Sequence, residues 1–411
     1  TAKDSLGNSV GTCTIIAPEV TCSVSPLLNG TPYTFTVSAS NSTGTTNGAT
    51  SLAIKPAGAP DAPSTVTAVR GNVLATVSFT APSFNGGAEI TSYTVTAKDS
   101  SGNTAGTCQV NAPALTCVVS GLTNGTAYTF VATANNGVLV SNPSTPSLAV
   151  TPATLPGPPT SVSASVTTAG AATVSFTAPA NNGGTALTGF TVISSPGGFT
   201  CSAAANASSC VVSGLTNGTA YTFSVVATNE IGDSVASASS SSVTPQSAAS
   251  APTTVTATAG DGQASVAFSG AVTNGSTISN YTVQAYDSNG NEVTGATCTT
   301  STSPCTITGL ANGSEYTFKV VTNSTVYGAG TTTPSLPSSS SNAIIPATVP
   351  DSPSGIEVTA GTGKISVSWD EPASNGSAIT SYTVQAYDSS DNPVIGATCV
   401  ATAPAVTCDV S

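Results

Sequence analysis

The chain has 411 residues, only 6% of them charged, and its 18 acidic and 6 basic residues give a net charge of −12. Six scattered basic residues cannot form a surface that neutralises phosphates, so this composition argues against nucleic-acid binding. No apolar run reaches the roughly 20 residues of a membrane helix, and we expect no membrane insertion. An apolar content of 39% supplies a folded core and argues against disorder.

The first segment, residues 1–57, begins inside a repeat. TAKDSLGNS at residue 1 matches TAKDSSGNT at residue 96, which lies within the third predicted strand of a later copy. We therefore expect 1–57 to be a partial unit that lacks its first strands. The tyrosine of the repeated phrase recurs every 93–95 residues, a period typical of whole domains and not of solenoid repeats.

Three whole units follow, at residues 58–153, 154–246 and 247–347, and a partial unit at 348–411 lacks its last strands. We number the units one to five in chain order. The two partial units share the segment between their cysteines, so simple strand donation from one molecule to the next would duplicate a strand. A window on a longer array explains both partial units better.

Each whole unit reads as a series of short strands. A proline-containing joint such as PDAPSTVTAV from Pro60 leads into an alternating strand that ends in an aromatic residue, TVSF at Phe79. An NGG or NGS turn and a further strand follow, as in YTVTA from Tyr93. Alternation of apolar and hydroxyl residues indicates half-buried strands, and no helical periodicity persists for three turns. About seven strands per unit predict an all-β fold of tandem antiparallel β-sandwiches.

The ten cysteines form five close pairs. A zinc site needs four ligands in proximity, often including histidine, whereas this chain has no histidine and its pairs lie about a hundred residues apart. One local disulfide per unit fits the spacing better and indicates an oxidising, extracellular or cell-surface location. The expected pairs are Cys13 and Cys22, Cys108 and Cys117, Cys201 and Cys210, Cys298 and Cys305, and Cys399 and Cys408.

The repeated phrase CVVSGLTNGTAYTF, which starts at Cys117 and returns at Cys210, carries a family resemblance. Together with the strand aromatics at Phe79 and Tyr93 and their equivalents, Leu122, Gly125 and Tyr128 resemble the signature of fibronectin type III domains. The cysteine pair departs from most animal members and, with the NGG turns, resembles repeats of secreted bacterial proteins. The resemblance implies a tyrosine corner, in which a core tyrosine bonds the backbone upstream. The corner tyrosines would be Tyr33, Tyr128, Tyr221 and Tyr316.

No residue set predicts catalysis, a cofactor or a metal. The chain has no histidine, and Asp370 and Glu371 point to opposite faces of a strand, which is unsuited to shared acid–base chemistry. YDSNGNE from Tyr286 superficially resembles a calcium loop, but its glycine comes too early and the final glutamate is missing, so we expect a hairpin turn.

Surface motifs are equally sparse. The loops before the last strands, including NSTVYGAGTTTPS from Asn323, lack an Arg-Gly-Asp tripeptide. Asn124, Asn217, Asn312 and Asn41 lie in Asn-Xaa-Ser/Thr sequons, but the first three fall in a turn that the fold requires and are weak indicators of glycosylation.

We therefore expect a non-catalytic extracellular array that forms a surface stalk, an adhesin shaft or the subunit of a filament. Short proline-containing joints limit bending, and the whole would span on the order of 150 Å. The expected partners are other copies or neighbouring repeats, with a cell-surface or polysaccharide ligand as a further possibility. The alternative is an accessory region of a secreted polysaccharide-degrading enzyme; scattered tyrosines do not form a sugar-binding strip.

Overall fold

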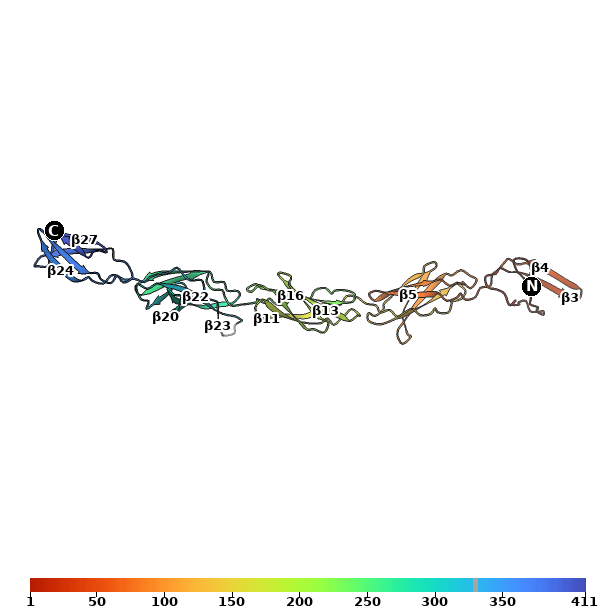
Figure 1. Cartoon of the computed structure of the whole chain (residues 1–411). Coiled ribbons are helices and arrows are strands. Elements are labelled where there is room, and N and C mark those ends of the chain that lie inside the picture. Colours follow the sequence, from red (N-terminus) through yellow and green to blue (C-terminus); the bar gives the residue numbers. More distant parts are fainter. Residues whose placement is uncertain (328–331) are drawn as a thin grey trace.

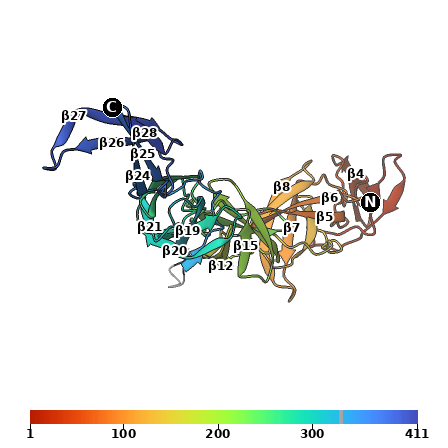
Figure 2. The same cartoon turned by 60° about the vertical axis from the view of Figure 1, so that its left-hand side comes forward.

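The computed structural model describes residues 1–327 and 332–411 as five β-rich units that follow one another in a single elongated row. The two ends of the chain lie at opposite ends of the row (Figure 1). Figure 2 shows that the fifth unit bends away from the direction of the others. Within the described residues, no helix is long and apolar enough to cross a lipid bilayer.

Unit two shows how a whole unit is built. One sheet has the order β5-β6-β9 and the other the order β10-β7-β8, with all pairs antiparallel. Side chains alternate between core and surface along each strand, so that in the repeated phrase Val119 is fully buried while Val118 is 51% exposed. The strands are β5 (Ser64–Arg70), β6 (Leu74–Thr80), β7 (Ser92–Lys98), β8 (Thr104–Asn111), β9 (Thr116–Ser120) and β10 (Thr129–Asn135).

Units three and four repeat this plan. Unit three has sheets β11-β12-β15 and β14-β13-β16, and unit four has β17-β18-β21 and β20-β19-β22-β23. Their strands are β11 (Thr160–Thr168), β12 (Ala171–Thr177), β13 (Leu187–Ser195), β14 (Thr200–Ala204), β15 (Ser209–Ser213), β16 (Thr222–Asn229), β17 (Thr254–Gly260), β18 (Gln263–Ser269), β19 (Thr277–Asp287), β20 (Glu292–Thr300), β21 (Cys305–Thr308), β22 (Tyr316–Thr325) and β23 (Thr332–Pro334).

Units one and five have fewer strands. Unit one forms one sheet of order β2-β1-β3-β4, and unit five forms β24-β25-β28 and the pair β26-β27. Their strands are β1 (Ala2–Lys3), β2 (Ser9–Gly11), β3 (Thr34–Asn41), β4 (Gly44–Thr50), β24 (Ser354–Gly361), β25 (Lys364–Asp370), β26 (Ser381–Tyr387), β27 (Pro393–Thr402) and β28 (Thr407–Val410).

An aromatic pair lies between the two sheets of units two to five. In unit two the ring centroids of Phe79 and Tyr93 lie 5.0 Å apart with the rings tilted, a favourable arrangement for aromatic side chains. The equivalent pairs are Phe176 with Phe190, Phe268 with Tyr281 and Trp369 with Tyr382. Valines from both sheets surround each pair in a separate core cluster per unit.

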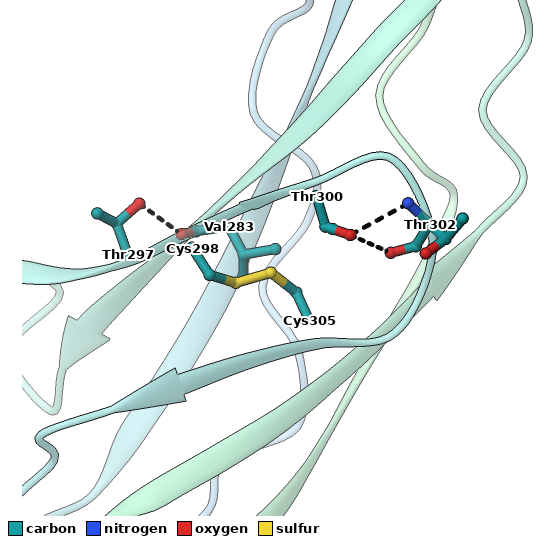
Figure 3. Close-up of a disulfide and its surroundings, with 6 residues drawn as sticks. All are labelled: Val283, Thr297, Cys298, Thr300, Thr302 and Cys305. Atoms are coloured by element: carbon teal, nitrogen blue, oxygen red, sulfur yellow. Dashed lines mark hydrogen bonds between the residues drawn. A yellow bond between two sulfur atoms is a disulfide. The ribbon is translucent and has the colours of Figure 1, made fainter.

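The disulfides of units two to five join the two sheets along one side of each sandwich. Cys298 lies on β20 and Cys305 on β21, edge strands of different sheets, and Val283 of the neighbouring strand lies beside the bond (Figure 3). All five expected pairs form, with Cα–Cα distances of 6.1–6.4 Å. In units two to five each bond therefore closes a gap between the edges of two sheets that hydrogen bonds do not bridge.

On the opposite side, units two and three differ from the expected seven strands, whereas unit four has all seven. Units two and three have six strands each, because the last segment before the joint forms no continuous ladder. In unit two, Ser141, Ser144 and Ser147 each donate their backbone N–H to a carbonyl of β10, and each Oγ accepts the N–H of the same β10 residue. We call this segment the serine latch. It advances three residues along the chain for every two residues of the strand that it pairs with.

The serine latch also explains how this edge avoids pairing with other strands. Each latch Oγ donates to the carbonyl of the next residue, and Pro143 and Pro146 between the serines have no N–H to offer. The same spacing recurs in the other whole units. The equivalent serines are Ser234, Ser237 and Ser240 in unit three, and Ser335, Ser338 and Ser341 in unit four.

Replacing a latch serine will loosen this edge. Ser144→Ala removes the acceptor for the buried N–H of Ala132, and such a loss costs roughly 1–3 kcal/mol. Hydrogen-exchange mass spectrometry of the whole chain should show faster exchange in the β10 peptide. Thr145→Ala, at the adjacent exposed position, is the control. Equal β10 protection in both variants would show that the latch contributes nothing.

Candidate functional site: the joint between units

The most regular structural feature outside the cores is the joint between consecutive units. Two elements meet there: the exit turn, an Asn-Gly pair before the corner tyrosine of one unit, and the entry loop, the NGG or NGS loop of the next. The exit-turn pairs are Asn29-Gly30, Asn124-Gly125, Asn217-Gly218 and Asn312-Gly313. The facing pairs of the entry loops are Gly86-Gly87, Gly183-Gly184, Asn274-Gly275 and Asn375-Gly376.

The exit turn is held rigidly to its own unit. In unit two the Tyr128 hydroxyl accepts the N–H of Thr123 at 3.2 Å, and the Asn124 Oδ1 accepts the N–H of Val73 in the first hairpin at 2.9 Å. The Gly125 N–H donates to the Pro152 carbonyl at the start of the linker. The other three corner tyrosines, Tyr33, Tyr221 and Tyr316, accept equivalent N–H groups at 3.0–3.1 Å.

Glycine faces glycine across every joint. A Cβ added to Gly184 would lie 2.5 Å from the Gly125 nitrogen and 2.9 Å from the Asn124 carbonyl carbon. Gly87, Gly275 and Gly376 meet Gly30, Gly218 and Gly313 in the same way, and each of these entry-loop glycines has a positive φ. No side chain fits here, because both the space and the backbone conformation require glycine.

The linker is bonded to the entry loop by its backbone. The Thr154 N–H donates to the Gly183 carbonyl at 2.8 Å, and the Gly157 N–H donates to the Asn181 carbonyl at 2.8 Å. The other three joints repeat both bonds at 2.8–3.1 Å. Since the same linker also accepts a bond from the exit turn, it cannot behave as a free tether.

An asparagine amide completes each joint in one of two ways. At the first two joints, Asn136 and Asn229 at the end of the sixth strand donate to the linker carbonyls of Gly58 and Thr154, each at 2.8 Å. They also donate to entry-loop carbonyls at 2.9 Å. The amide nitrogen lies against the first glycine of the entry-loop pair, Gly86 or Gly183. A Cβ added to that glycine would lie 2.8 Å from the amide nitrogen.

At the last two joints, that preceding entry-loop glycine is replaced by asparagine. Asn274 donates to the Ala248 carbonyl and Asn375 to the Val349 carbonyl, both at 3.0 Å. Each adopts a positive φ of 48–49°, which asparagine tolerates better than other side chains. The amide thus comes from the entry loop itself, and it binds the carbonyl one residue farther along the linker than in the first two joints.

Three joints carry an additional side-chain contact; between units four and five, the Thr348 hydroxyl donates to the Asp261 Oδ2 at 2.9 Å. Between units two and three, Arg70 and Glu230 form a paired contact at 2.6 and 3.4 Å, and the Arg70 hydrogen bond and charge lower the pKa of the Glu230 carboxyl. Between units three and four, Tyr327 accepts the Gln246 N–H and donates to the Gln246 carbonyl, each at 3.0 Å. These contacts distinguish otherwise similar joints.

The remaining residues considered from the sequence lie in turns and on strands. Asp287 of YDSNGNE accepts backbone N–H groups of Asn289 and Asn291, and the Asn291 N–H lowers the pKa of that carboxyl. Asp370 and Glu371 are exposed at the end of β25. Residues 328–331 of the loop NSTVYGAGTTTPS lie outside the described residues. The described residues contain no group of three or more metal-ligating side chains.

A cleft of about 850 Å³ opens beside β26 in unit five, lined by Trp369, Tyr382 and Val410 among others. The strand β26 corresponds to β7 of unit two. The cleft lies on the side of β26 where, in unit two, β10 pairs with β7. In the whole units the sixth strand covers this side, so the cleft is the uncovered side of the unit-five core, lined by side chains of both sheets.

Comparisons with known proteins agree with this architecture. The sequence profile of the Fibronectin type III domain matches residues 60–150, 157–243 and 250–341, which together exceed half of the chain. The chain belongs to the fibronectin type III family. A crystal structure of chicken CNTN1 FN1–FN3 domains is 18% identical, covering 70% of this chain and 99% of that one, with a TM-score of 0.29. No curated protein matches the sequence.

Sequence reasoning missed the joint asparagines of these fibronectin type III units. Asn136 and Asn229 are flanked by different residues, in NNG and TNE, so no shared motif marks them. From the sequence, the entry-loop glycines are predicted only as turn residues. The available signal was that the second residue of the entry-loop pair is glycine at all four joints. A turn alone would also accept asparagine there, so the constant glycine indicates a close contact.

We predict that Gly184→Ala forces units two and three apart, because the new Cβ collides with backbone that cannot rotate away. Small-angle X-ray scattering should show a broader range of shapes. Gly198→Ala in the same unit is the matched control: it imposes a comparable backbone penalty of about 1–2 kcal/mol at positive φ but has no atom within 4 Å. Indistinguishable scattering from the two variants would refute the role of the glycine contact.

Acid will loosen the joint between units two and three. The folded-state pKa of Glu230 is lowered, so the ion pair contributes fully above the ordinary value of 4.5 and is lost as pH falls through the lowered value. Electron microscopy should show a wider spread of the angle between units two and three at about pH 3 than at pH 7. Glu230→Gln should produce the same wider spread at pH 7. The joint between units three and four is the internal control. An unchanged spread in acid and in the variant would contradict the expectation.

Proposed function

We propose that the chain is a stiff extracellular spacer: the shaft of a surface stalk or adhesin, or the subunit of a filament. The observation that carries this proposal is the joint. All four joints use the same glycine contact, the same two linker hydrogen bonds and one asparagine amide. A flexible tether needs none of these, whereas a spacer that transmits position or force needs all of them.

The location follows from the cysteines. All ten form disulfides, and the described residues contain no free cysteine. Such bonds persist in oxidising compartments, which supports secretion or surface display. The few charges of the surface put little electrostatic repulsion between parallel copies, which favours self-association over charge-guided recognition of an unrelated partner.

The chemistry of the exposed surface supports a non-catalytic role. The pKa values of the exposed carboxyls of Asp99, Asp287 and Asp388 are lowered by N–H groups of their own turns. A general acid or base needs a pKa near the working pH, and these shifts go in the opposite direction. These carboxylates stabilise hairpins instead.

Electron microscopy of the native material released from its source tests the proposal. Rods or long fibres of uniform width, with an axial repeat equal to one or several units, are the expected result. Short rods capped by a globular head with glycan-degrading activity would instead identify an accessory region of an enzyme. Randomly bent chains with no preferred angle between units would contradict the stiff spacer itself.

A further inference from the structure

Asn-Xaa-Ser/Thr tripeptides, the acceptors of N-linked sugar, occur ten times in the chain and look equivalent in the sequence. Their surroundings in the structure differ greatly. A sugar attached to an asparagine Nδ2 needs open space and an amide that the fold does not use. The asparagines are Asn29, Asn41, Asn124, Asn206, Asn217, Asn274, Asn280, Asn312, Asn323 and Asn375.

Six of these asparagines lie in the joints, four in exit turns and two in entry loops. The Asn124 Nδ2 donates to Asn72 Oδ1 at 2.8 Å, and the Nδ2 atoms of Asn274 and Asn375 donate to linker carbonyls. The glycine beside each one touches the next or the preceding unit. A sugar at any of these positions would displace the neighbouring unit.

Three further sequons are also part of the structure. The Asn323 Nδ2 on β22 donates to Asn280 Oδ1 at 2.7 Å, so two sequons bind each other across neighbouring strands. Asn41 aligns with Asn136 and Asn229, which close joints, and its Oδ1 accepts the N–H groups of Thr43 and Gly44. Asn41 therefore occupies the place that closes joints in units two and three, and its own turn holds its side chain through the Oδ1.

Among the ten asparagines, Asn206 combines an exposed side chain that makes no hydrogen bond to any described residue with a position outside every joint. It lies in the turn between β14 and β15, closed by the bond from the Ala207 N–H to the Ala204 carbonyl at 2.9 Å. The residue is exposed, and among the hydrogen bonds of the described residues none uses its side chain. None links residues 205–208 to unit two either. The Cys201–Cys210 disulfide ties the two strands beside this turn together.

The repeat itself marks this position as unusual. Counted from the first cysteine of each pair, the place of Asn206 is taken by Pro18, Pro113 and Pro404 in units one, two and five. Proline suits such a turn because its φ is fixed. Unit three has an asparagine in place of this proline, followed by alanine and serine. These three residues form a sequon at a turn where the other units have none.

We propose that Asn206 carries an N-linked oligosaccharide, the attachment of which joins the asparagine Nδ2 to the reducing-end carbon of the sugar with loss of the leaving group of an activated glycan donor. The sugar would extend from the flank of unit three, beside a joint but outside it. This assignment does not depend on the array being a stalk, since it rests on the exposure and free side chain of one turn.

Peptide mapping of the native protein by mass spectrometry tests the proposal. The peptide containing Asn206 should carry a sugar mass that is removed by a reagent cleaving N-linked glycans, while the joint peptides containing Asn124, Asn217 and Asn312 stay unmodified. An unmodified Asn206 peptide, or sugar on the joint asparagines, would overturn the assignment. Sugar released only by a reagent for O-linked glycans would overturn it as well.

Variants made in the source organism separate the sequon from the turn. Ser208→Ala should abolish the added mass and Ser208→Thr should retain it, because both keep the turn and only the first destroys the sequon. Pro113→Asn combined with Leu115→Ser transfers the sequon to unit two and should add a second sugar there. Modification that persists in Ser208→Ala, or a transferred sequon that stays bare, would show that this turn geometry does not decide acceptance.

Discussion

The direct contact between the backbones of two glycines, one on each side of a joint, is the constraint on which the array depends. It brings consecutive units so close that the linker must lie flat against both, and its N–H and carbonyl groups then find partners on the exit turn and the entry loop. A single methyl group at Gly184 or its equivalents would remove this proximity. The asparagine amides act on a geometry that the glycines have already set.

Each sandwich is closed independently of its neighbours, by different means on its two sides. On one side a disulfide joins the edge strands of the two sheets, as between Cys298 and Cys305. On the other, a serine latch runs along the outer strand and satisfies its N–H and carbonyl groups without forming a new edge. Units closed in this way can stand in a row and contact one another only at their ends.

Much of this structure could be predicted from the sequence. Alternating residues such as those of the strand that carries Phe79 indicate which strand face is buried, and the spacing of the cysteines identifies the disulfides, because both signals are local. The serine latch was not predicted, since a segment advancing three residues for every two of its partner matches neither strand nor helix periodicity. The role of Asn229 also escaped, because its partners lie 75 and 47 residues away.

The placement of the cysteines has a consequence for how such an array is made. Partners in units one, two, three and five are nine residues apart, whereas the nearest cysteine of another unit is roughly ten times farther along the chain, a difference worth about 2 kcal/mol of loop-closure free energy. Oxidation therefore favours the correct partner even before a core exists. Gene duplication can lengthen a protein of this kind without multiplying the ways in which its thiols mispair.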